Sequence, residues 1–154
     1  MANHLSFDLH ALVARLDRSA DRILRAELDL SYRRFLALFM IKELEATSQR
    51  ALAERLDVSE PAVSRMTAVL GDAGLLVVEP DPAGGNRRRL RLTAAGDRLV
   101  EASRGLLAER FDTLLEMSRV PAAEYARHTR ALLETLADGG QQPETGDALA
   151  GATR

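Results

Sequence analysis

The sequence predicts a mostly α-helical fold with one small β-hairpin. Apolar residues make up 46% of the 154 residues, but only two tyrosines and four phenylalanines are aromatic, and leucine and alanine dominate. This composition favours helices. Apolar residues recur at steps of three and four along most of the chain, which is the helical period. Only the stretch after Gly74 changes to short β-type runs flanked by turn residues.

Composition also limits the class of protein. The chain has no cysteine, which excludes disulfide frameworks, zinc ribbons and thiol switches and fits a reducing cytoplasm. The N-terminus lacks a basic region followed by an apolar run, and no window is apolar for long enough to span a membrane. We therefore expect a cytoplasmic protein. The net charge of −2 gives no overall attraction to nucleic acid, so any such binding must come from locally clustered charge.

The first three helices are predicted from apolar spacing and from hydroxyl residues at their starts. Residues from Ser6 to about Glu27 form one long amphipathic pattern, with Ser6 as the expected N-cap. A second helix is expected after Ser31 and a third after Ser48, since each hydroxyl can accept a hydrogen bond from an unpaired amide of the first turn.

A fourth helix should begin at Ser59 and end near Gly74. Pro61 is tolerated in a first turn because the amide there has no helical partner, and glycine is favoured just beyond a helix end. The segment "DVS" joins this helix to the preceding one, in which Ala51, Leu52 and Leu56 are expected to face inward. A connection of this length is typical of a helix-turn-helix.

The hairpin and two further helices complete the pattern. The runs "LLVVE" and "NRRRLRL" read as strands around the turn residues "PDPAGG". Thr93 should cap a long helix that ends at about Met117, and Pro121 should open a last helix through Leu136. Residues 139–154 have the composition of a disordered tail.

The fourth helix presents two different faces. At about 100° per residue, Val63, Met66 and Leu70 share a stripe that should face the core. The opposite stripe is small and polar with a single arginine, which suits a surface that enters the DNA major groove, where arginine can contact guanine O6 and N7. The alternative is a helical hairpin with an exposed polar face, which many α proteins contain. The residues of the opposite stripe are Pro61, Ser64, Arg65 and Ala68.

The hairpin carries a cluster of positive charge that favours the DNA-binding interpretation. Arg87, Arg88, Arg89 and Arg91 lie beside a Gly-rich tip, with no acidic residue among them. A helix-turn-helix followed directly by a basic hairpin is the winged-helix arrangement, in which the helix reads bases and the wing contacts phosphate or the minor groove.

The runs "LSYRRFLALFMI", "SQRALAERLDVSEPAVSRMTAVLGDAGLL" and "GNRRRLRLTAAG" resemble the multiple antibiotic resistance regulator (MarR) family of bacterial transcription factors. The resemblance implies a homodimer, most often a repressor, on a near-palindromic operator. It also implies an N-terminal dimerisation helix at 1–30, a winged helix-turn-helix at 31–93 and C-terminal dimerisation helices at 94–138.

The resemblance also assigns roles to single residues. Ser59, Pro61, Ser64 and Arg65 match its recognition-helix positions. Glu60 stands at the start of the same helix, where a carboxylate favours the helix dipole, repels phosphate and can accept from a cytosine amino group. The matches to phosphate-contacting positions are Ser48, Gln49 and Arg50 at the start of the third helix, and Arg88 in the wing, flanked by Arg87 and Arg89.

One position departs from the family pattern. An aspartate usually stands two residues before the wing arginine and forms an ion pair that holds the wing, whereas this chain has Asn86 there. The strand that follows is also short. Asp81 is the candidate for a substitute partner, and the wing tip is expected to differ in shape or mobility.

Family members often bind small aromatic or phenolic anions where the dimerisation helices meet the winged domain. His10, Arg18, Tyr32 and Arg34 lie on the two helices that would line such a pocket here. The alternative for each of them is ordinary packing or solvent contact. Cysteine oxidation, a regulatory mode of some relatives, is excluded by composition.

Nothing in the sequence indicates an enzyme. His4, His10 and His128 have no metal-ligand spacing, and no nucleophile or phosphate-binding motif occurs, so neither a metal nor a cofactor is expected. Two alternatives to an effector-controlled regulator remain open. One is a helical dimerisation or scaffold protein without DNA binding, and the other is a constitutive DNA-binding protein without an effector.

Overall fold

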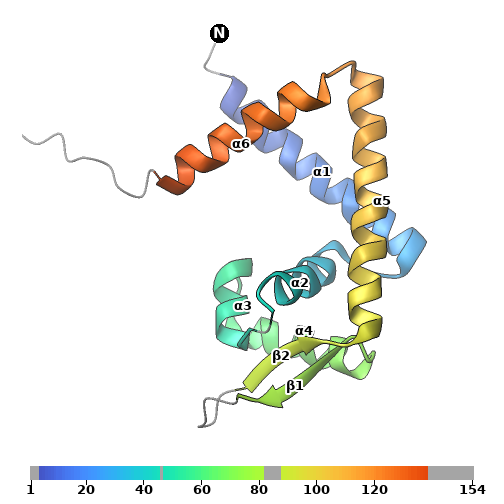
Figure 1. Ribbon diagram of the computed structural model, residues 1–154, viewed down its shortest axis with the longest axis vertical. Helices are drawn as coiled ribbons and strands as arrows, with labels where there is room; N and C mark the ends of the chain where they lie inside the picture. The colour runs from blue at the N-terminus through green and yellow to red at the C-terminus, as the bar shows by residue number, and fades with distance from the viewer. Residues whose placement is uncertain (1–3, 46, 82–87, 139–154) are drawn as a thin grey trace, which may run out of the picture. The chain divides into compact units, whose positions relative to one another are not determined.

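The structure is a computed structural model that describes residues 4–45, 47–81 and 88–138. Within these residues it is mostly helical with one antiparallel hairpin, as predicted (Figure 1). The chain divides into two compact units between Glu109 and Arg110. The elements are α1 (Leu5–Leu28), α2 (Tyr32–Glu43), α3 (Gln49–Leu56), α4 (Glu60–Asp72), β1 (Leu76–Pro80), β2 (Arg88–Leu92), α5 (Ala94–Ser118) and α6 (Ala122–Asp138).

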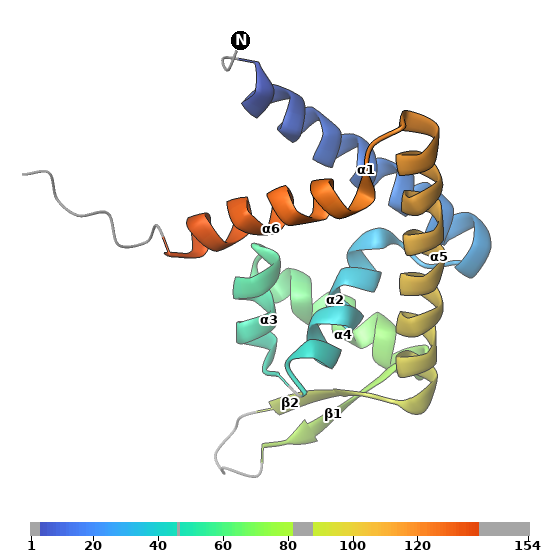
Figure 2. The same ribbon diagram turned by 45° about the horizontal axis from the view of Figure 1, so that its top comes forward.

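The core of the first unit lies where α2, α3 and α4 meet the hairpin. Helix α3 packs against α4 and α2, while α2 also contacts β2 and α4 contacts β1. Figure 2 shows α2, α3 and α4 on one side of the hairpin. The side chains in this core are almost all aliphatic, so burial of leucine, valine and isoleucine supplies most of its stabilisation. Fully buried members include Leu24, Leu38, Ile41, Leu52, Val63, Leu70, Leu76, Leu90 and Val100.

Three of the predicted N-caps are confirmed. The hydroxyls of Ser31, Ser48 and Ser59 each accept a hydrogen bond from the amide three residues on, at 3.3, 3.1 and 3.4 Å. The prediction for Ser6 was wrong, since α1 begins at Leu5 and the residue before it, His4, makes no capping bond through its side chain. Ser6 lies inside the first turn, so its own hydroxyl is placed too late to cap it.

The junction between α4, the hairpin and α5 depends on two glycines and a threonine. Gly74 has a positive φ of 71° just after α4, as its predicted place beyond the helix end requires. The Thr93 hydroxyl donates to the Gly74 carbonyl at 2.7 Å and accepts from the Gly96 amide at 3.1 Å, which confirms Thr93 as a cap. A Cβ at position 96 would lie 2.0 Å from the Leu75 carbonyl oxygen, so only glycine fits there.

An isolated β-bridge connects the hairpin to the helix-turn-helix. β1 and β2 pair in register from Leu76 opposite Leu92 to Pro80 opposite Arg88. Thr47, just before α3, exchanges backbone hydrogen bonds with Leu90 at 3.2 and 2.7 Å. The strand that carries the arginines is therefore hydrogen-bonded on both sides, and its position relative to α3 is set by backbone geometry.

Lys42 joins α2 to the start of α5. Its Nζ lies 2.8 Å from Asp97 Oδ1 and 2.5 Å from Glu101 Oε1. Hydrogen bonding to these carboxylates raises the pKa of Lys42, and the ammonium lowers the pKa of Glu101. Arg104, further along α5, places its guanidinium 5.6 Å from the centre of the Phe39 ring of α2. This cation–π contact also stabilises the packing of α5 against α2.

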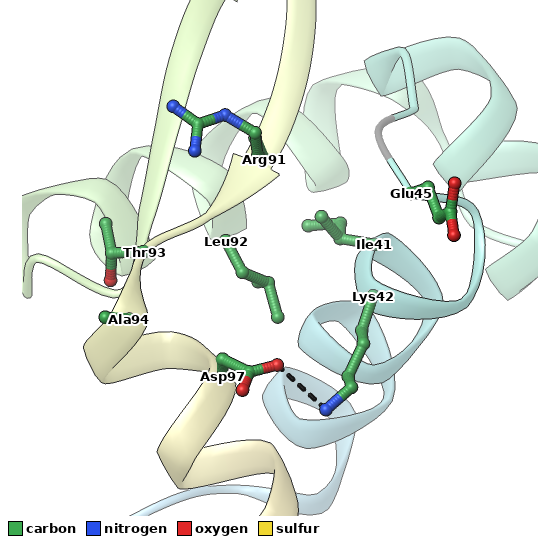
Figure 3. A pocket seen from close by; sticks show the side chains of 8 residues that line it. All are labelled: Ile41, Lys42, Glu45, Arg91, Leu92, Thr93, Ala94 and Asp97. Atoms are coloured by element: carbon green, nitrogen blue, oxygen red, sulfur yellow. Dashed lines mark ion pairs between the residues drawn. The ribbon is translucent and has the colours of Figure 1, made fainter.

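Beside this ion pair lies a surface hollow of about 380 Å³ between the ends of α2 and β2 and the first turn of α5 (Figure 3). Both of its cations, Lys42 and Arg91, already have carboxylate partners. Its two other charged lining residues, Glu45 and Asp97, are both acidic. The hollow therefore offers no uncompensated positive charge to an anion.

The second unit contains the end of α5 and all of α6. The Tyr125 amide donates to the Pro121 carbonyl at 3.0 Å, so Pro121 opens α6 as predicted. Phe111 and Tyr125 place their ring centres 6.4 Å apart and join the two helices of this unit. Within the described residues, no helix is both long and apolar enough to cross a membrane.

Candidate nucleic-acid interface

Helix α4 separates a buried face from an exposed one, as its sequence predicts. Val63 and Leu70 are 0% and 1% exposed, and Met66 is half-buried against the same core. On the other face every side chain is small except that of one arginine. The helix surface is therefore narrow there, and only the positively charged arginine side chain projects from it. Such a face can approach the floor of a major groove without steric conflict. The exposed residues are Pro61, Ser64, Arg65 and Ala68.

The turn before α4 sets the angle of this helix. Asp57 ends α3 in the left-handed conformation with φ of 51°, and the Val58 amide donates to the Ala53 carbonyl at 3.1 Å. Ser59 then caps α4 and Glu60 follows, exposed, in its first turn. An exposed hollow of about 410 Å³ at this turn is lined by the acidic residues Glu54, Asp57 and Glu60 together with Arg50.

The three candidates at the start of α3 have different environments. Ser48 is exposed and its hydroxyl caps the helix. Arg50 is exposed and its Nε lies 3.2 Å from the Glu54 carboxylate, one turn along the same helix. Gln49 is half-buried, and its side-chain amide donates to Thr67 of α4 at 3.1 Å. Only Ser48 and Arg50 are therefore on the surface.

Sequence reasoning missed Thr67, a buried polar residue within the apolar side of α4. Thr67 is 1% exposed, and its hydroxyl donates to the Ser64 carbonyl at 3.1 Å. A threonine in a stripe of Val63, Met66 and Leu70 was the available signal, because a buried hydroxyl requires hydrogen-bond partners.

The arginines of the wing lie on two faces of the hairpin. Along β2, Arg89 and Arg91 lie on one face of the hairpin and Arg88 lies on the other. Arg91 pairs with Glu79 of β1 at 2.6 Å, and this guanidinium lowers the pKa of Glu79. Arg88 and Arg89 are exposed, and neither forms an ion pair within the described part of the chain.

Glu79 is a second residue that sequence reasoning missed. The strand register places it opposite Arg89 and diagonal to Arg91, on the same face. It follows that the hairpin has an internal ion pair, although the family's usual aspartate is absent. Asn86 and Arg87 lie outside the described residues, and the proposed role of Asp81, which follows β1, stays a prediction.

The geometry described so far is a helix-turn-helix with a basic hairpin at its side. The profile of the MarR family matches residues 28–85, which contain α2, α3, α4 and β1. This stretch of the chain is therefore similar to the MarR family. No curated protein matches the sequence.

Solved structures of MarR family regulators share the fold over most of this chain. A mutant of MarR from E. coli is 23% identical, with a TM-score of 0.75, and the likeness covers 86% of this chain and 96% of that one. MepR, a transcription regulator of the Staphylococcus aureus multidrug efflux pump MepA, is 22% identical, with a TM-score of 0.67 and coverage of 87% and 97%. A MepR mutant bound to an oligodeoxyribonucleotide is 23% identical, with a TM-score of 0.60 and coverage of 86% and 96%. The predicted winged helix-turn-helix fold is confirmed.

The four candidate effector residues do not line any of the hollows described above. His10 and Arg18 are exposed on α1, and Arg34 is exposed on α2. Tyr32 is half-buried and stacks on Phe35 at 6.0 Å. Burial, followed by the nearby Asp17 carboxylate, raises the pKa of Tyr32, so its hydroxyl stays protonated at neutral pH. Among the described residues, no cluster of histidines and carboxylates could hold a metal ion.

Proposed function

We propose that this protein is a member of the MarR family and a sequence-specific regulator of transcription that binds double-stranded DNA. In this proposal it acts as a homodimeric repressor on a pseudo-palindromic operator in the cytoplasm. The observation that carries the proposal is the exposed face of α4, with Ser64 and Arg65, on the same compact unit as the arginine hairpin. The DNA-bound MepR mutant, which shares the fold, supports the choice of DNA as partner.

The two parts of this surface have different physical tasks. Arg65 is positioned for a bidentate contact with a guanine, which is a sequence-dependent interaction. Arg88, Arg89, Ser48 and Arg50 are placed for contacts with the phosphate backbone, which supply affinity that depends little on sequence. Arg50 must exchange its Glu54 partner for a phosphate, and an exposed pair of this kind costs little to break.

The proposed homodimer is supported by apolar surface that the single chain leaves exposed. In α1, Leu5, Leu9 and Val13 recur every four residues on one face and are 61%, 37% and 55% exposed, and α6 exposes Leu133 and Leu136 to 61% and 78%. Exposed apolar stripes of this kind mark interaction surfaces in water-soluble proteins. We assign residues 1–30 and 94–138 to dimerisation and 31–93 to DNA binding.

Selection of duplexes from a random pool tests this function directly. The wild-type protein should enrich a pseudo-palindromic sequence and should sediment as a dimer. A stable dimer that enriches no sequence and binds no duplex at low salt would instead support the scaffold alternative. The proposed function requires no cofactor, metal or catalytic residue.

Arg88→Ala should weaken binding to the selected operator and to a scrambled duplex by similar factors. Loss of a phosphate contact removes about one counterion from the salt dependence, so the slope of log K against log salt should become less steep by about one unit per half-site. Titrations of both duplexes at several salt concentrations measure this. A loss confined to the operator would instead identify Arg88 as a base-reading residue.

An aromatic acid is expected to weaken the operator complex if the protein is effector-controlled. A ligand that favours one spacing of the two recognition helices must disfavour DNA binding at another spacing. Titration of the complex with salicylate-like acids tests this, and Tyr32→Phe with Arg34→Ala should reduce the response. No change in operator affinity up to millimolar acid would favour the constitutive DNA-binding alternative for this ligand class.

A further inference from the structure

A buried chain of hydrogen bonds joins the start of α3 to the DNA-facing turn of α4. Gln49 Nε2 donates to Thr67 Oγ1 at 3.1 Å, and Thr67 Oγ1 donates its proton to the Ser64 carbonyl at 3.1 Å. Thr67 is 1% exposed and Gln49 is half-buried. The chain therefore runs from the first turn of one helix, through the interior, to a residue of the exposed face of the other.

The direction of these bonds is fixed by the number of protons. A threonine hydroxyl has a single proton, which Thr67 gives to Ser64, so its oxygen can only accept from a second partner. The amide of Gln49 supplies that donor. A glutamate at this position would present only acceptors to the Thr67 oxygen, and an alanine would present nothing.

We infer that Gln49 is a positioning residue for DNA recognition, acting through Thr67. This inference rests on the proposed function. Contacts from the start of α3 to phosphate set the register of the protein on the duplex, and contacts from α4 to bases read the sequence. Ser48 and Arg50 lie on the surface on either side of Gln49, while Gln49 itself faces α4. The Gln49–Thr67 bond thus holds the base-reading Ser64–Arg65 turn at a fixed place relative to the phosphate-contacting residues.

The competing hypothesis is the one that the sequence suggests, a direct contact between Gln49 and phosphate. The two hypotheses differ in what Thr67 does. If Gln49 acts through Thr67, removal of either side chain removes the same interaction. If Gln49 contacts phosphate, Thr67 is irrelevant to its effect and the two substitutions act independently.

A double-mutant cycle separates them, with Gln49→Ala, Thr67→Val and the double variant measured on the selected operator and on a scrambled duplex. Each single substitution should lower the ratio of operator to scrambled affinity about three- to tenfold, as expected for one hydrogen bond. The double variant should lose no more than either single variant. Affinity for the scrambled duplex should stay unchanged, and Thr67→Ser, which keeps the hydroxyl, should retain the wild-type ratio.

Hydrogen exchange of the free protein supplies a readout without DNA. Amides of α4 around Ser64 and Thr67 should exchange faster in Gln49→Ala and in Thr67→Val than in the wild type. Additive losses in the cycle, equal losses on both duplexes, or unchanged exchange would each overturn the inference alone. A wild-type protein that selects no duplex would overturn the proposed function, and this inference with it.

Discussion

Arg65→Ala is expected to weaken binding to the operator by about 1–3 kcal/mol and to change binding to a scrambled duplex much less. Arg65 is exposed on the face of α4 opposite Val63 and Leu70, and it is the one arginine on that helix. A bidentate contact with guanine is lost entirely when the guanidinium is removed, whereas the general attraction to phosphate keeps its other contributors. Specificity should therefore fall more than affinity for random DNA.

The matched control is Arg33→Ala, which removes the same charge from an exposed position in the first turn of α2, outside α4 and the hairpin. It should leave the ratio of operator to scrambled affinity unchanged. Equilibrium titration of both duplexes at one salt concentration gives the ratio for each variant. If Arg65→Ala loses operator and scrambled binding equally, α4 is not the base-reading helix.

The features that sequence predicted well are local ones. Ser31, Ser48 and Ser59 cap their helices because a cap needs only a hydroxyl beside the first turn, and that spacing is visible in the chain. The two faces of α4 follow from the helical period in the same way. Ser6 failed as a cap because several early residues fit an amphipathic pattern, so periodicity alone did not fix where α1 begins.

The features that sequence did not predict are contacts between elements. From its place at the start of α3, Gln49 is predicted to contact phosphate. The direction of its side chain, however, is set by a hydrogen bond to Thr67, which lies 18 residues later. Glu79 and Arg91 form their ion pair only through the strand register, and Lys42 reaches Asp97 across two helices. Each of these contacts depends on how two elements are placed relative to each other. Residue spacing within a single element carries no information about that placement.

Leu133→Glu is expected to convert the proposed dimer to a monomer and to weaken operator binding by about 10²–10⁴-fold, the usual gain from joining two binding sites. Leu133 is 61% exposed on α6 and shares a stripe with Leu132 and Leu136, which are 57% and 78% exposed. If this stripe packs in a dimer interface, a glutamate there must be buried without a partner, which is strongly unfavourable.

Sedimentation measures the oligomeric state. Titrations of the full operator and of a duplex with a single half-site distinguish a loss of dimerisation from a loss of folding. Binding to a duplex with only one half-site should be the same for Leu133→Glu and the wild type, because each winged unit keeps its own DNA-binding surface. Ala131→Glu is the matched control, since it adds the same side chain and the same charge to an exposed position on the opposite side of α6. It should leave dimer and operator binding intact.

A wild-type protein that sediments as a stable monomer at micromolar concentration would contradict both the dimer and the palindromic operator. Equal weakening by Leu133→Glu and Ala131→Glu would show that added negative charge, and not a broken interface, opposes DNA binding.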